Sequence, residues 1–540
     1  MMKELVLFDS NPVYFFILSL GFLFILIQLN WQKHQSDTVF LSTLILILTV
    51  LRLPFILYNQ QINIDESSVI TQAMTLWDRP IFWQSVDGTT SGPLNSYVLF
   101  LGKLLTGTFD YTSCRLVGLL LIISTLIALY KALQSFFDTQ SARLSLTLTL
   151  LFYAYNQTHD FIHYSSEILS IFLFSISLYS LASIQKSPRT FGFLLGFVLA
   201  LVPWAKIQSL PIALVFTGYG LYLCFQIRAY KGILNLVLGA TFVTVLIFGL
   251  LLYYHVLGDF YRYYIEGNLV YGQDVSLYRR FHHLVAMLVK VFPFRDFLLI
   301  SILLFSFAFR WFWKLEKSLL VFLASWFLIT AYTIVKPGMF FHHYLLYFIP
   351  FLTFINTFSL RSITRNFSYR TVQLSYTLAL IIVGSSVWWT SLIRDTSYTN
   401  AEDTKALASN RVITTIHQYS GPGESLAIWG WWTEGYVMAQ MPQAVAENHS
   451  VRCTTESPLM VDYQQRYLHN LKTNTPAVFV DAVGSKHNFP FVHTSAIHES
   501  IPSIRQYIQR HYQFLSRVEG VRIFIRKDRL AAVQRGIRYL

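Results

Sequence analysis

Long apolar runs that are almost free of charge recur along this sequence, and they constrain its fold more than any other feature. A run of about 20 such residues forms a helix that can cross roughly 30 Å of hydrocarbon. Hydrophobic residues make up 54% of the 540 residues and charged residues 13%, against about 25% charged in an average soluble domain. These values exclude a soluble globular fold and predict a polytopic α-helical membrane protein.

About twelve stretches are long and apolar enough to be transmembrane helices. Hydrophobic periodicity does not fix the ends of helices inside uniformly apolar sequence, so these boundaries are approximate. The predicted spans lie near residues 11–29, 39–57, 113–133, 141–156, 165–184, 190–204, 207–226, 232–254, 294–312, 318–335, 343–360 and 371–393.

Lys and Arg gather in alternate short loops, such as 186–189, 228–231 and 361–370, whereas the opposite loops hold most of the acids. The positive-inside rule places the basic loops in the cytoplasm. The net charge of +13 is therefore interpreted from the way the charged residues are distributed between the two sides of the membrane. We expect membrane lipids around the helices and no nucleic acid as a partner.

The composition becomes mixed after the last predicted span, which predicts two domains. Residues 1–394 would form the transmembrane domain, and residues 395–540 a small soluble α/β domain on the extracytoplasmic side. Short apolar runs at 426–429, 477–480 and 521–525 are typical of its strands.

Two outer loops, residues 58–112 and 255–293, are too long to be simple connections, and such loops are often functional. The first begins with Asp65 and Glu66, of which one is expected to face a given site. A solvated turn or a helix N-terminus, which favours negative charge, is the alternative interpretation. The sequence indicates no anchor for the second loop.

Three further charged residues are expected at the same outer level: Glu167, Lys206 and Lys336. A carboxylate at the mouth of a membrane helix is costly without a partner or a function. Snorkelling to the interface would explain each lysine alone. Together the charges suit transfer from a phosphate leaving group, because cations stabilise its developing charge while a carboxylate activates an acceptor hydroxyl. Arg262 and Arg279 are candidates to complete the phosphate site.

Several short motifs occur in a fixed order between about residues 40 and 360. They are Asp65-Glu66, Asp87-Gly88, Arg115-Leu116, Tyr164-Ser165-Ser166-Glu167, Lys206, and Lys336 followed by His342-His343-Tyr344. In this order they resemble the GT-C membrane glycosyltransferases, specifically the branch of protein O-mannosyltransferases and lipid A aminoarabinose transferases.

The resemblance implies an inverting hexosyl- or pentosyltransferase. Its donor would be a sugar on a polyprenyl-phosphate carrier, and its acceptor a glycan, lipid or protein hydroxyl. It also implies the bacterial inner (plasma) membrane, with the active site and the C-terminal domain on the extracytoplasmic side.

The same resemblance assigns expected roles to residues. Asp65 would be the general base, assisted by Glu66 and Glu167. The remaining assignments are Lys206, Lys336, Arg262 and Arg279 for the donor phosphate, and His342, His343 and Tyr344 for the substrate.

No cofactor is certain. A divalent metal at His282-His283 or His342-His343 is the lesser interpretation, because adjacent histidines at an interface are more often hydrogen-bonding residues. Ser91-Gly92 also departs from the sequence that some relatives use at a metal site. The alternative function is a secondary transporter or flippase of a glycolipid or small anionic solute, whose charges should lie near the membrane midplane.

Overall fold

The computed structural model describes residues 12–31, 36–272, 275–393, 411–421, 423–489 and 492–535. Helices occupy all twelve predicted places. The transmembrane and peripheral helices up to Ile393 are α2 (Pro12–Trp31), α3 (Asp37–Leu57), α4 (Ile64–Asp78), α5 (Pro93–Val98), α6 (Phe100–Thr106), α7 (Tyr111–Phe136), α8 (Thr139–Tyr155), α9 (His159–Ile162), α10 (Glu167–Ser183), α11 (Pro188–Ala205), η1 (Ile207–Ser209), α12 (Leu210–Gln226), α13 (Tyr230–Tyr253), α14 (Leu257–Asp259), η2 (Phe260–Glu266), α15 (Gly267–Val270), α16 (Leu277–Lys290), α17 (Phe292–Phe312), α18 (Lys317–Val335), η3 (His342–Phe348), α19 (Ile349–Asn366) and α20 (Tyr369–Ile393).

Eight helical segments in the described part of the chain have the length and hydropathy of a membrane span. They are Asp37–Leu57, Tyr111–Phe136, Pro188–Ala205, Ile207–Gln226, Tyr230–Tyr253, Phe292–Phe312, Lys317–Val335 and His342–Asn366. This result confirms a polytopic helical membrane protein.

The chain divides into two compact units. The helical unit comprises Met1–Tyr58, Arg115–Gly249 and Gly272–Asn400, and the mixed unit comprises Asn59–Cys114, Leu250–Tyr271 and Ala401–Leu540. The predicted domain boundary at residue 394 lies outside the described residues. The division into 1–394 and 395–540 therefore stays a prediction.

Two central helices explain why some spans are less apolar than others. Every side chain of α8 from Ser141 to Tyr155 is buried, and α19 is buried from Ile349 to Leu360. Thr149 and Thr353 share a hydrogen bond of 2.8 Å between these helices. Polar residues that bond across helices are tolerated there because they never face lipid.

Glycines allow α11 and α13 of the helical unit to touch. A Cβ atom at Gly196 would overlap the backbone carbonyl of Leu236, and one at Gly239 would overlap that of Phe193. Small residues at such crossings let two membrane helices pack closely by van der Waals contact.

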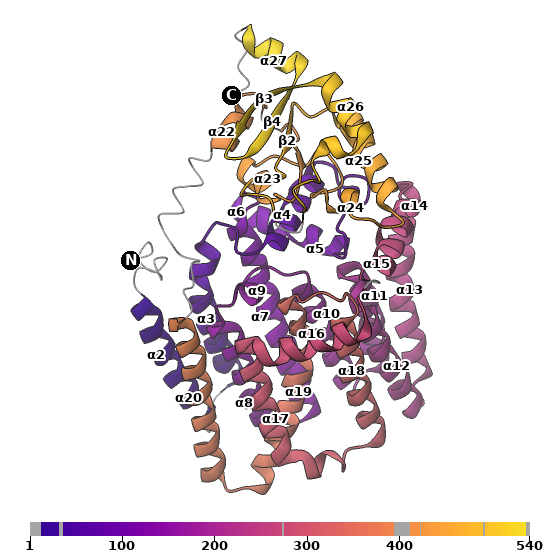
Figure 1. The fold of residues 1–540 in the computed structure, drawn as a ribbon. Helices are drawn as coiled ribbons and strands as arrows, with labels where there is room; N and C mark the ends of the chain where they lie inside the picture. Colours follow the sequence, from indigo (N-terminus) through magenta and orange to yellow (C-terminus); the bar gives the residue numbers. More distant parts are fainter. Residues whose placement is uncertain are drawn as a thin grey trace. The chain divides into compact units, whose positions relative to one another are not determined.

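Helix α16 runs across the helical bundle rather than along it (Figure 1). Its apolar side chains Leu277, Tyr278 and Phe281 are exposed. The span α17 begins at Phe292, only two residues after α16 ends at Lys290. An exposed apolar face joined so closely to a span is typical of a helix at the membrane interface.

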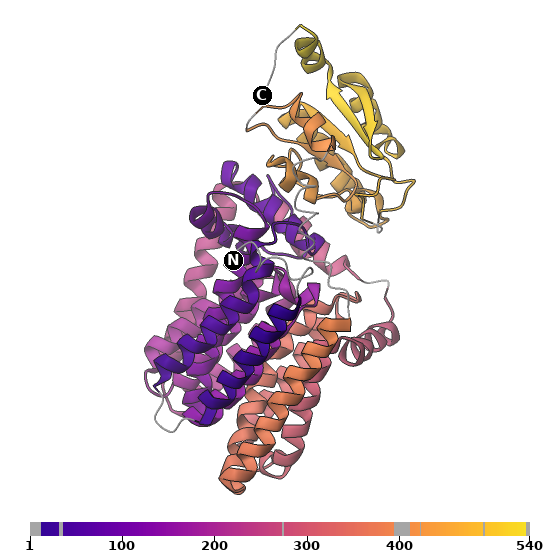
Figure 2. The same ribbon diagram turned by 90° about the vertical axis from the view of Figure 1, so that its left-hand side faces the viewer.

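The mixed unit contains a four-stranded sheet with the order β1-β2-β4-β3 (Figure 2). Its strands are β1 (Ala427–Trp429), β2 (Val478–Asp481), β3 (Tyr512–Val518) and β4 (Val521–Arg526). β1 and β2 pair in parallel, and the other two pairs are antiparallel. The accompanying helices are α22 (Arg411–His417), α23 (Glu434–Ala439), α24 (Val451–Thr454), α25 (Met460–Asn474), η4 (His498–Ser500), α26 (Pro502–His511) and α27 (Lys527–Gln534). The predicted mixed helix-and-strand domain is confirmed.

Three segments that are far apart in the sequence contact one another in the mixed unit. Asp87 donates its backbone N–H to Ala446 O at 2.8 Å, and Asn268 donates its side-chain amide to Thr89 O at 3.1 Å. Arg466 forms ion pairs with Asp87 and with Glu447, the latter at 2.8 Å. The first outer loop and part of the second are therefore built into the same compact unit as the C-terminal sheet.

Candidate functional site

A buried ion pair lies at the centre of the candidate site in the helical unit. Lys206 Nζ pairs with Glu167 Oε1, and the two side chains are 3% and 0% exposed. Lys206 also donates to Ser166 Oγ at 2.7 Å, and its ammonium lies 4.9 Å from the centre of the Tyr344 ring. Three of the predicted site residues are thus brought together, and the charge of Lys206 is compensated by a carboxylate.

Local sequence explains how this pair is positioned. Helix α11 ends at Ala205, just after Pro203, and Lys206 has an extended backbone before η1 begins. This break turns the lysine out of the helix axis. Glu167 is the first residue of α10, where the helix dipole favours a carboxylate.

His343 lies between two acids. Its Nε2 is 3.9 Å from Glu167 Oε1, and its Nδ1 is 3.9 Å from Asp160 Oδ1. His342 Nδ1 is 2.9 Å from Asp160 Oδ2. The structure therefore adds Asp160 to the predicted set. Asp160 lies between α8 and α10, only seven residues before Glu167, and this proximity in sequence is the signal that could have identified it.

The surroundings of Asp160 favour its ionised form. Burial raises the pKa of Asp160, but its contacts with His342 and His343 and the charges of His343 and His159 outweigh burial and hold this pKa below its usual range. Asp160, Glu167, Lys206, His342 and His343 form a group of neighbouring acidic and basic side chains, here called the acid–base cluster.

Lys336 lies in the loop after α18, in the same unit. Burial and, secondly, the charge of Arg280 lower the pKa of Lys336. Arg280 binds the backbone carbonyls of Lys336 and Gly272, and donates to Val275 O at 2.9 Å. Arg280, rather than the exposed Arg279, anchors α16 to this loop. No feature of the sequence had predicted this anchor.

Asp65 and Glu66 open α4 in the mixed unit. The side chain of Asn63 caps the helix by accepting the backbone N–H of Asp65 at 2.9 Å. Glu66 is fully buried, whereas Asp65 is partly exposed. Only one of the two carboxylates thus remains accessible. Because Asp65 belongs to the mixed unit and Glu167 to the helical unit, their predicted convergence stays a prediction.

Asp65 interacts electrostatically with Tyr271, which belongs to the same mixed unit. Burial raises the pKa of Tyr271 to about 12, and the charge of Asp65 adds to this effect while Arg452 opposes it. Arg452 lies 5.8 Å from the centre of the Tyr271 ring.

The predicted phosphate ligand Arg262 forms an exposed ion pair with Asp462 at 3.0 Å. Its role in phosphate binding stays a prediction.

The tryptophan-rich segment near β1 contributes mainly to the core of the mixed unit. Trp429 is fully buried and donates its indole N–H to Ala496 O at 2.8 Å. Trp432 is also buried, while Trp431 is partly exposed and lies 4.3 Å from the His449 ring. Core packing therefore accounts for Trp429 and Trp432.

Glu434, in α23, supports a prediction about pH. Burial raises the pKa of Glu434 from 4.5 to about 7. The folded state therefore holds this proton more tightly than the unfolded state, so stability should fall by roughly 2–3 kcal/mol as the pH rises from 4.5 to 7. Replacing Glu434 by Gln should remove that fall, measured as the difference in melting temperature between pH 5 and pH 8. The exposed Glu456→Gln variant should keep the wild-type difference, and an unchanged difference in Glu434→Gln would contradict the prediction.

One group in the described part of the chain has three metal-type ligands whose atoms lie within 4.8 Å of one another: Asp481, His498 and Glu499. Arg522 already pairs with both acids, with Glu499 at 2.6 Å. This guanidinium supplies the positive charge that a metal would bring, so the group does not fit a metal site. The predicted histidine pairs do not form such a group within the described residues.

No protein-family model matches the sequence, and no curated protein matches it. Among solved structures, ArnT from Cupriavidus metallidurans bound to undecaprenyl phosphate matches with a TM-score of 0.57 and 11% identity, over 91% of this chain and 98% of that chain. Its apo state matches with the same values. An Archaeoglobus fulgidus oligosaccharyltransferase in complex with Zn and sulfate matches with a TM-score of 0.46 and 13% identity, over 82% of this chain and 67% of that chain.

The match with ArnT confirms the predicted fold. The chain is a multi-pass membrane protein that shares its fold with ArnT.

Proposed function

We propose that this protein is a GT-C-type glycosyltransferase that moves a sugar from a polyprenyl-phosphate carrier to an acceptor hydroxyl on the outer membrane face. The observation that carries the proposal is the buried acid–base cluster within a fold shared with ArnT, a protein solved with undecaprenyl phosphate bound. The acceptor is a glycan, a lipid or a protein.

The reaction inverts the anomeric carbon. The acceptor oxygen attacks this carbon opposite the phosphate, Asp65 takes the hydroxyl proton, and the bond between the sugar and the phosphate oxygen breaks. The carrier leaves as a polyprenyl phosphate. Cations stabilise the charge that the leaving phosphate gains, most strongly where water is excluded.

We assign the proposed roles first for the residues of the mixed unit and then for those of the helical unit. Asp65, supported by the buried Glu66, serves as base from the mixed unit. In the helical unit, Glu167 fixes Lys206, and His343 positions the substrate between the two acids. Lys336 is the preferred phosphate ligand, because its loop lies between α18 and α19 and leads directly to His342 and His343. Arg262 and Arg279 remain secondary candidates, and use of Lys206 for phosphate requires its exchange from Glu167.

The Lys336→Met variant should weaken donor use by roughly tenfold to a hundredfold, the value of a charge-assisted hydrogen bond, with little change in melting temperature. Because the pKa of Lys336 is lowered, wild-type donor binding should weaken as the pH rises through that pKa. The measurement is the KM for the donor between pH 6 and 10. Lys290→Met, at an exposed site in α16, is the control. Equal KM values in Lys336→Met and wild type would remove this residue from the phosphate site.

We propose about twelve spans, adding α2, α8, α10 and α20 to the eight long apolar helices. The C-terminal domain then lies on the extracytoplasmic side of a bacterial inner membrane. An impermeant thiol reagent on intact cells should label Ser485→Cys and not Ser187→Cys. The native residues Cys114, Cys224 and Cys453 are buried and should give little background. The reverse labelling pattern would overturn the orientation.

Labelled donor in proteoliposomes tests the reaction type. A transferase moves the label from the lipid to an acceptor in a covalent bond. A flippase or transporter instead moves the glycolipid or solute across the bilayer unchanged, and that result would reject the proposal.

A further inference from the structure

Helix α16 has an apolar face that the described part of the chain leaves uncovered. Leu277 is 84% exposed and Phe281 66%, and Tyr278, Val285 and Val289 are exposed as well. With 3.6 residues per helical turn, these five positions fall within one arc of about 120°. An apolar stripe of this width is costly in water and requires an apolar environment.

The neighbouring spans place α16 at a membrane surface. The span α17 begins at Phe292, and the successive span α18 returns to the same surface before the loop that starts at Lys336. Arg280 donates to the backbone carbonyl of Lys336, and His283 Nδ1 lies 3.2 Å from Gly338 O. The helix is therefore held against this loop and runs along the membrane surface (Figure 1).

The charge of α16 is entirely positive. Its sequence contains Arg279, Arg280 and Lys290 and no acidic residue. Arg280 is occupied by backbone carbonyls, whereas Arg279 is exposed, and none of the ion pairs of the described residues includes it. A basic helix with one apolar face binds to the surface of membranes that contain anionic lipids.

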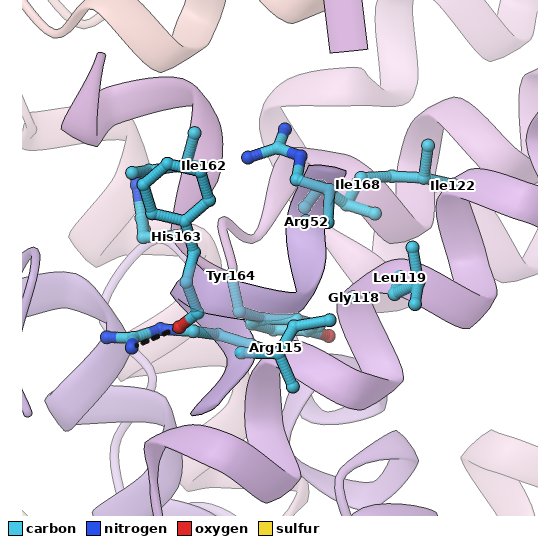
Figure 3. A pocket seen from close by; sticks show the side chains of 11 residues that line it. Arg52, Arg115, Gly118, Leu119, Ile122, Ile162, His163, Tyr164 and Ile168 are labelled. Atoms are coloured by element: carbon cyan, nitrogen blue, oxygen red, sulfur yellow. Dashed lines mark hydrogen bonds between the residues drawn. The ribbon is translucent and has the colours of Figure 1, made fainter. Parts of the chain in front are cut away.

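Two other arginines of the helical unit show the contrasting, internal arrangement. Arg52 and Arg115 line a small pocket between α3 and α7, and both are buried (Figure 3). Arg52 donates to Phe161 O at 3.0 Å, and Arg115 donates to Phe55 O at 2.8 Å. These side chains bind the protein backbone, whereas Arg279 extends from the surface of its helix.

We propose that α16 binds anionic phospholipids of the surrounding bilayer, with its apolar face among the acyl chains and Arg279 against the head-group phosphates. A soluble anion would satisfy the charge alone, whereas a phospholipid satisfies the charge and the apolar face together. In this arrangement Arg279 contacts bilayer lipid rather than the phosphate of a sugar donor. The inference rests on exposure, charge and the position of the helix, and does not depend on the proposed transferase activity.

The test is fluorescence quenching by brominated lipids in nanodiscs that contain the full-length protein. A bimane label on Val285→Cys reports from the apolar face of α16, and the three native cysteines are buried. Both brominated phosphatidylcholine and brominated phosphatidylglycerol should quench this label. Association of phosphatidylglycerol should be about fivefold stronger, the effect of one basic residue near a membrane surface. The same label on Leu246→Cys, exposed in α13, whose only charged residue is Lys231, should show a ratio near one.

Three variants assign the preference to the charge of Arg279. Arg279→Gln should lower the ratio roughly fivefold, and Arg279→Lys, which keeps the charge, should retain most of it. Arg370→Gln, which removes an exposed charge elsewhere in the helical unit, should keep the original ratio. Sodium chloride and inorganic phosphate at equal ionic strength should weaken the preference equally, by screening.

Four results would overturn the proposal. Without quenching by either lipid, the apolar face of α16 would be covered by protein. A ratio at Val285 equal to that at Leu246, or an unchanged ratio in Arg279→Gln, would show that Arg279 does not select anionic lipid. A larger loss with inorganic phosphate than with chloride would show that Arg279 binds a soluble anion. Equal loss in Arg279→Lys and Arg279→Gln would exclude charge as the cause.

Discussion

Replacing Asp65 by Asn should abolish sugar transfer while the protein still folds and binds its lipid donor. The substitution is nearly isosteric and removes only the proton acceptor, whose loss typically lowers a rate about 10²- to 10⁴-fold. Asp65 is the accessible carboxylate of the pair that opens α4, since Glu66 is fully buried. Turnover is measured with a verified donor, together with donor affinity and melting temperature.

Asp78→Asn is the matched control, because Asp78 is exposed at the other end of the same helix. It should retain wild-type turnover. Near-normal turnover in Asp65→Asn would show that another group accepts the proton.

Replacing Lys206 by Met should destabilise the protein by about 3–5 kcal/mol, because it leaves Glu167 charged and buried without its partner. The sequence predicted Lys206 as a ligand of the donor phosphate. The ion pair changes that expectation. The double variant Lys206→Met/Glu167→Gln carries no unpaired charge and should recover much of the lost stability. Thermal unfolding of the four proteins in detergent gives the coupling between the two residues.

Arg262→Met provides the control for this double-mutant cycle of Lys206 and Glu167. Arg262 pairs with Asp462 through a side chain that is 53% exposed, and an exposed pair contributes only about 0–1 kcal/mol. A melting temperature of Lys206→Met equal to that of the wild type would contradict the importance of the buried pair.

Much of the fold could be predicted because membrane spans leave a strong signal in the sequence. Long apolar runs identified the helix at each of the twelve predicted spans, and short apolar runs identified β1, β2 and β4. β3 was missed, since its alternating residues are mostly exposed or partly exposed and include few of the apolar runs that mark a buried strand. Its hairpin with β4 is closed at Glu519 and Gly520, both with positive φ, as two-residue hairpin turns require.

The candidate site could be predicted by residue type but not by pairing. Glu167 and Lys206 were predicted because charged groups at a helix mouth are costly without a partner or a function. His343 was predicted from the family resemblance. Which cation neutralises which acid depends on helix packing, and no spacing rule in one sequence gives it. Asp160 was therefore treated as an ordinary loop acid.

The most direct test of the central claim is to measure free polyprenyl phosphate and glycosylated acceptor together. Purified protein is incubated with a panel of polyprenyl-phosphate sugars and with glycan, lipid and protein acceptors from a bacterial envelope. The account predicts that one donor yields both products in equal amounts, with inverted anomeric configuration, and that Asp65→Asn yields neither. Absence of transfer from every polyprenyl-phosphate sugar, with transfer from a nucleotide sugar instead, would contradict it.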